Sequence, residues 1–235
     1  MVEHRNALGQ PIGVALPGWR GCPRPEQQQI EGRFARLEPL RAARHGADLW
    51  QVFAADTEGH GWTYLPFGPF DGQADMTAFL EAMSKTEDPL YFAICDRVSG
   101  QAQGIASYMR IQPEHGVIEV GGIAFAPVLQ RSRVATEAMF LMMSHAFDTL
   151  GYRRYEWKCD ALNAPSRRAA ERLGFHYDGL FEQAIVYKGR NRDTAWYSIL
   201  DRDWPKLRQR FVDWLAPENF SPNGQQRHRL GVGRA

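Results

Sequence analysis

Two segments of the sequence carry residue types and spacings suited to phosphate binding and group transfer. The first, residues 119–138, has the sequence EVGGIAFAPVLQRSRVATEA. Its apolar part predicts a strand that ends at Phe125, Pro127 stops the strand pairing, and the loop Gln130–Arg133 opens an apolar helix. Backbone N–H groups at such a helix start, helped by two arginines, can hold a pyrophosphate. An ordinary strand-to-helix connection with two solvated arginines is the alternative.

The second segment, residues 163–175, has the sequence NAPSRRAAERLGF and predicts a short helix. Asn163 can cap its start, and Pro165 is tolerated in its first turn. Gly174 ends the helix, and Phe175 begins the next strand. A short surface helix that packs its apolar residues inward would show the same pattern, so this segment gains weight only together with the first.

Alternating strand and helix signals surround these two segments. The strands predicted at 91–96 and 103–111 form a hairpin about the turn at 98–100. A strand–helix–strand–helix–strand order follows, which implies an α/β (α+β) mixed sheet with helices on both faces. The predicted strands are 32–37, 91–96, 103–111, 117–125, 154–159, 175–186 and 194–200, and the predicted helices are 48–55, 74–85, 131–150, 164–173 and 204–214. Residues 188–193 form a polar hairpin turn.

Composition limits the classes of function. The 235 residues are 44% hydrophobic and 23% charged, as in globular proteins, and 28 Lys+Arg against 27 Asp+Glu leave a net charge of +1. This balance argues against a general nucleic-acid or membrane-surface binder. The longest apolar run, Ala138–Met143, is too short to span a bilayer. The N-terminus has no apolar signal region, so we expect a cytoplasmic protein.

The cysteines and the chain ends complete this outline. Cys22, Cys95 and Cys159 are far apart and form no CxxC pair, so we expect reduced thiols and no metal. One domain, 31–216, is expected between two ends. Prolines and glycines make residues 1–30 an irregular arm over the domain surface, and the polar residues 217–235 predict a disordered tail.

Together the two segments resemble the GNAT N-acetyltransferase superfamily. The family's acyl-CoA motif, (Q/R)-x-x-G-x-(G/A), corresponds here to residues 130–135, and its N-x-x-S…L-G-F pattern corresponds to Asn163, Ser166 and residues 173–175. The second pattern is similar to the RimJ/RimL branch, which acetylates protein N-termini and other amines. The order of elements fits from about residue 32 to 200. Arg133 replaces the motif's central glycine, and Ala170 stands where many members carry a tyrosine that protonates the thiolate.

The resemblance implies a single GNAT-like domain with a mostly antiparallel central sheet and a splayed central strand. It implies acetyl-CoA as cofactor, and N–H groups near 123–125 that polarise the thioester carbonyl. The cofactor-binding residues that it implies are Ile123, Ala124, Phe125, Gln130, Arg131, Ser132, Arg133, Val134, Ala135, Thr136, Asn163 and Ser166.

The resemblance also suggests catalytic residues. An amine must be neutral to attack a thioester, and a strand carboxylate can take its proton. Glu119 is the candidate base and also an acceptor-binding residue, although it could simply pair with an arginine or face solvent. Ser166 is expected to steady the sulfur with a hydrogen bond. Trp62 and Tyr64 in an aromatic-rich loop are candidates for binding the acceptor, with a core role as the alternative.

The expected activity is therefore transfer of an acetyl group from acetyl-CoA to a primary amine, a small molecule or a protein N-terminus, by a monomer or homodimer. A non-catalytic acyl-CoA-binding sensor is the second hypothesis, because of the substitutions at Arg133 and Ala170. A nucleotide-phosphate or RNA binder is the third, although the chain has no GxxxxGK[ST] motif and its charge is balanced.

Overall fold

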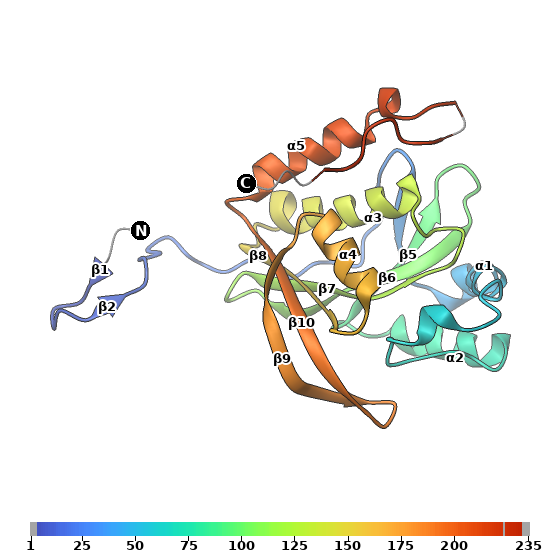
Figure 1. Cartoon of the computed structure of the whole chain (residues 1–235), viewed down its shortest axis with the longest axis horizontal. Helices are drawn as coiled ribbons and strands as arrows, with labels where there is room; N and C mark the ends of the chain where they lie inside the picture. Colours follow the sequence, from blue (N-terminus) through green and yellow to red (C-terminus); the bar gives the residue numbers. More distant parts are fainter. Residues whose placement is uncertain (1–3, 223, 232–235) are drawn as a thin grey trace.

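An eight-stranded sheet forms the centre of the computed structural model, which describes residues 4–222 and 224–231 (Figure 1). Its strand order is β3-β4-β5-β6-β7-β8-β10-β9, and neighbours are antiparallel except for the parallel pair β7–β8. This arrangement confirms the predicted mixed, mostly antiparallel sheet. The strands are β3 (Ile30–Glu31), β4 (Ala35–Pro39), β5 (Leu90–Asp96), β6 (Ala102–Gln112), β7 (Val117–Phe125), β8 (Arg154–Asp160), β9 (His176–Tyr187) and β10 (Arg190–Leu200).

Helices cover both faces of this sheet, as predicted. Side chains alternate along β5, so that residues 90, 92 and 94 join one apolar core while 91, 93 and 95 join the other. The first core lies under α3 (Arg133–Ser144), α4 (Ala164–Arg172) and α5 (Trp204–Leu215). Helix α3 continues as a π-helical turn (His145–Thr149). The second lies under α1 (Ala42–Phe53) and α2 (Gln73–Met83). Short 3₁₀ turns span His60–Trp62 and Pro217–Asn219.

The strand expected at 32–37 lies at 35–39 instead, because of a contact between residues that are far apart in the sequence. The backbone N–H groups of residues 33, 34 and 35 all donate to the carboxylate of Glu137, a buried residue of α3. This carboxylate takes the place of a strand partner at that point, so regular pairing of β4 begins only at Ala35. Glu137 therefore fixes the first strand of the predicted domain on the helix that carries the motif.

The two ends of the chain differ from their predicted descriptions. Figure 1 shows the hairpin of β1 (His4–Arg5) and β2 (Pro11–Ile12) projecting away from the domain instead of lying over it. At the other end the sequence predicts disorder, whereas Phe220 packs edge-on against Trp214 with ring centroids 5.1 Å apart, and Leu230 is buried. These two apolar side chains hold residues 217–222 and 224–231 against the domain. Residues 1–3, 223 and 232–235 lie outside the description.

Within the described residues, no helix combines the length and the apolar character that crossing a membrane requires.

Candidate active site

The centre of the sheet opens between β7 and β8. Their parallel pairing runs from Val117 opposite Arg154 to Val120 opposite Trp157 and then stops, although both strands continue. Beyond that point, within the described residues, β7 is paired only with β6. Gly122 has φ +58° and interrupts the β6–β7 register, which is the geometry of a β-bulge. The backbone of residues 121–125 therefore faces an opening, which confirms the predicted splayed central strand.

The start of α3 lies at this opening. Ser132 caps the helix, because its Oγ accepts the Ala135 N–H at 3.0 Å. Arg131 adopts a left-handed backbone with φ +59°, which turns the chain sharply before the cap, so the helix predicted from residue 131 begins at Arg133. The Gln130 amide donates to the Phe125 carbonyl at 3.1 Å and closes the loop onto the end of β7. The predicted phosphate-binding loop thus adjoins the splayed strand.

Arg133 has a more structural environment than the motif suggests. Its guanidinium lies 4.4 Å from the centroid of the Phe34 ring and 5.7 Å from that of Phe220. These contacts are cation–π interactions with the start of β4 and with the C-terminal segment. Val134, Ala135 and Thr136 are buried in the first turns of α3. Arg131 is the other cation of this loop, and it is exposed.

The second motif places Ser166 beside β8. The Asn163 side chain accepts the Ser166 N–H at 3.0 Å and caps α4, as predicted. The indole N–H of Trp157 then donates to Ser166 Oγ at 3.0 Å. Burial raises the pKa of the neighbouring Cys159 thiol, and Ser166 partly offsets this effect. Ser166 therefore lies against β8 on the α4 side, where its hydroxyl accepts from Trp157 and adjoins the Cys159 thiol.

Glu119 approaches the opening from the other face of the sheet. Glu119 is 3% exposed, and its carboxylate lies 2.8 Å from Lys158 Nζ and 3.4 Å from Arg110 Nε. Lys158 Nζ also lies 2.7 Å from Glu156 and 3.8 Å from the centroid of the Trp196 ring. Burial raises the pKa of Glu119, while Lys158 and Arg110 work against that rise. Glu119 thus forms ion pairs, as the alternative hypothesis expected, and it also lies next to the opening between β7 and β8.

Residues of the aromatic-rich loop contribute both to the core and to the surroundings of the opening. Trp62 is buried against Phe53, with centroids 4.9 Å apart, and also lines a small pocket with Ala124 and Phe125 of β7. Tyr64 is half-buried. Lys188, in the turn between β9 and β10, donates to the Trp62 and Gly68 carbonyls, both at 2.9 Å. The β9–β10 turn and this loop are therefore joined beside the end of β7.

Lys158 and Trp196 are members of this site that the sequence reasoning missed. A usable signal exists in β8, RYEWKCD, where charged residues alternate with aromatic residues and cysteine. A period of two places residues 154, 156 and 158 on one face and 155, 157 and 159 on the other. The structure has this arrangement, with the charged row beside Glu119 and the other row in the core under α3 and α4.

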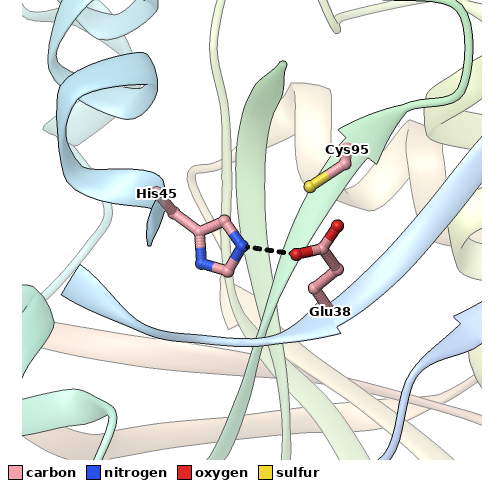
Figure 2. Close-up of side chains that lie close together, drawn as sticks. All are labelled: Glu38, His45 and Cys95. Atoms are coloured by element: carbon pink, nitrogen blue, oxygen red, sulfur yellow. Dashed lines mark hydrogen bonds and ion pairs between the residues drawn. The ribbon is translucent and has the colours of Figure 1, made fainter. Parts of the chain in front are cut away.

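A separate cluster, Glu38, His45 and Cys95, has the residue types of a metal site (Figure 2). However, His45 Nδ1 accepts the Arg41 N–H at 3.1 Å, so Nε2 carries the proton that faces Glu38 at 3.0 Å. Burial raises the pKa of the Cys95 thiol to about 12, which keeps it protonated. Hydrogen bonds already engage the cluster, and it anchors the start of α1 to β4.

Comparison with known proteins identifies the family. The model of the acetyltransferase (GNAT) domain matches residues 35–176. A crystal structure of a GCN5-related N-acetyltransferase from Brucella melitensis is 49% identical, with a TM-score of 0.89, over 92% of this chain and 97% of that one. An uncharacterized N-acetyltransferase p20 from Bacillus licheniformis is 25% identical over 72% of this chain and 95% of its own length. The putative ribosomal N-acetyltransferase YdaF from Bacillus subtilis (strain 168) is 26% identical over 45% of this chain and 57% of its own length. With the splayed sheet and the capped loop in place, the chain belongs to the GNAT family and is an N-acetyltransferase.

Proposed function

We propose that this enzyme transfers an acetyl group from acetyl-CoA to a primary amine by direct attack in a ternary complex. The observation that carries the proposal is the opening between β7 and β8, because the capped start of α3 adjoins it, Ser166 lies on one face and Glu119 on the other. A pantetheine arm that enters from the helix start would bring its thioester between these two side chains.

Each candidate residue has a role in this scheme. The N–H groups at the start of α3, with Arg131, hold the pyrophosphate. The backbone N–H groups of 123–125 polarise the thioester carbonyl. Glu119 accepts the ammonium proton, and the amine then attacks the carbonyl carbon. When the tetrahedral intermediate collapses, the C–S bond breaks and the second proton of the attacking nitrogen passes to the departing sulfur, so that the amide and the CoA thiol are the products. The Ser166 hydroxyl stabilises the departing sulfur by a hydrogen bond.

Acceptors of the RimJ/RimL branch, protein N-termini in particular, are the finer part of the proposal. Its support is the pattern of Asn163, Ser166 and residues 173–175, together with the likeness to a putative ribosomal N-acetyltransferase over less than half of this chain. A peptide acceptor has an α-amine that is partly neutral near pH 7, which reduces the demand on the base.

The non-catalytic acyl-CoA-binding module of the second hypothesis is not supported, because the family model and the relatives identify an N-acetyltransferase.

The test has two stages. Acetyl-CoA should raise the unfolding temperature, by an amount that corresponds to about 2.7 kcal/mol at a hundredfold excess over Kd, while adenine alone should not. Release of CoA is then measured with a panel of peptides that differ in their first residue, polyamines and free amino acids. Stabilisation without CoA release from any of these amines would overturn the proposed acceptor class, and no stabilisation at millimolar acetyl-CoA would overturn the cofactor assignment.

A further inference from the structure

We propose that the hairpin arm, residues 4–18, binds strand β9 of a second copy of this chain, so that two chains exchange arms in a homodimer. The proposal is independent of the acceptor and of the catalytic residues. It rests on two apolar surfaces that the described chain leaves uncovered and on the charges that accompany them.

The hairpin arm is an ordered element that lacks a packing surface of its own. Asn6 closes its turn, because the side-chain oxygen accepts the Leu8 and Gln10 N–H groups at 2.9 and 3.0 Å. A two-stranded hairpin alone is only marginally stable in water. The arm nevertheless carries four highly exposed aliphatic side chains: Leu8 at 83%, Ile12 at 52%, Val14 at 70% and Leu16 at 49%. Such a run is typical of a contact surface.

The root of the arm points it away from its own domain. The Trp19 indole donates to the Glu114 carbonyl at 2.7 Å, and the Cys22 N–H donates to the Pro113 carbonyl at 2.9 Å. Arg153 lies 5.4 Å from the Trp19 ring centroid and completes this anchor. Figure 1 shows the chain beyond the anchor extending outward from the sheet. The arm therefore extends away from its own domain, which leaves its apolar side chains uncovered.

Strand β9 is a matching surface. It is the last strand of the sheet, so its outer edge has no strand partner within the described residues. Its 12 residues include four exposed large apolar side chains, Tyr177, Leu180, Phe181 and Val186. A long edge strand with exposed apolar residues readily pairs with another chain. Its backbone groups and its side chains thus both offer contacts to an added extended segment.

The charges of the two surfaces favour the pairing of the arm with β9. Residues 4–18 contain one arginine and no acidic residue, whereas β9 contains Asp178 and Glu182 and neither lysine nor arginine. Asp178 already pairs with Arg154, so Glu182 is the acidic side chain that β9 offers to the arm. A twofold dimer in which each arm lies on the partner's β9 joins opposite charges and covers both apolar surfaces twice.

The test uses the full chain in sedimentation equilibrium. The unchanged protein should be a dimer. Ile12→Ser with Val14→Ser in the arm, and separately Leu180→Ser with Val186→Ser in β9, should each raise the dissociation constant at least about a hundredfold, because each removes apolar contact area twice per dimer. Gly13→Ser is the matched control, since open space surrounds this glycine, and it should leave the dimer intact.

Mixing the two variants tests the exchange itself. The arm variant keeps an intact β9 and the β9 variant keeps an intact arm, so the mixture should form a heterodimer through one intact contact although neither variant forms homodimers. A single cooperative melting transition in each variant, at a temperature that does not depend on protein concentration, shows that the monomeric variants fold. A monomeric parent chain, a dimer that resists either pair of substitutions, or variants that fail to associate on mixing would each overturn the proposal.

Discussion

Replacement of Glu119 by Gln tests the proposed base most directly. The amide keeps the size of the side chain but cannot accept a proton from the incoming ammonium. Lys158 keeps its contact with Glu156 at 2.7 Å in this variant, so its buried charge remains compensated. Breaking a buried pair entirely costs about 3–5 kcal/mol, and we expect less than about 2 kcal/mol here because the lysine retains a partner.

The expected kinetic effect is larger than this change in stability. A general base contributes about 10²–10⁴-fold, which corresponds to about 2.7–5.4 kcal/mol of the barrier. With a peptide N-terminus as acceptor, whose amine has a pKa of about 7.8, the neutral fraction rises about sevenfold between pH 7 and pH 9. The deficit of Glu119→Gln in kcat/KM should therefore shrink by up to about this factor over that range.

The assay is CoA release across this pH range at saturating acetyl-CoA, with Glu156→Gln as the matched control. Glu156 lies opposite Glu119 in the β7–β8 register and shares Lys158 as a partner, so it reports the cost of disturbing the same ion network. We expect its deficit to be smaller and independent of pH. Equal deficits in both variants at every pH would refute a base role for Glu119 and leave it as a structural carboxylate.

Four further predictions follow from contacts of other residues. Ser166→Ala removes one hydrogen-bonding group and should lower kcat by about tenfold or less, without rescue by pH, in the same assay; a loss beyond a thousandfold would contradict a merely stabilising role. Arg133→Ala should lower the melting temperature, because it loses two ring contacts worth about 0.5–1 kcal/mol. Arg131→Ala should weaken acetyl-CoA binding more than Arg133→Ala does. Calorimetric titration of both variants with acetyl-CoA shows which arginine binds the cofactor. Glu137→Gln replaces an acceptor of three backbone N–H groups and should lower the free energy of unfolding by about 1.5–3 kcal/mol in urea; an unchanged midpoint would contradict this role. Burial lowers the pKa of His45, against the effect of Glu38, so the unfolded chain binds a proton more readily and stability is lost as pH falls below about 6.5. The drop in melting temperature from pH 7.5 to 5.5 should therefore be smaller in His45→Gln than in the unchanged protein. Equal drops would exclude this histidine as the cause.

The sequence by itself determined the elements and the family. Local signals sufficed for this, because a turn such as 98–100, a capping residue such as Asn163 and an apolar period are properties of neighbouring residues. The strand, loop and helix of residues 117–150 were predictable for the same reason. The charged row along β8 was also readable in principle, since alternation alone separates its two faces.

Only the tertiary structure decided which of these residues meet. Glu119 and Lys158 lie on different strands, and their contact depends on the parallel register of β7 and β8, which no local pattern encodes. Phe34 and Phe220 lie far apart in the sequence, yet both rings contact Arg133 and turn a motif arginine into a packing residue. The burial of Phe220 and Leu230 holds the C-terminal segment against the domain, because a few apolar side chains suffice once a folded surface is there to receive them.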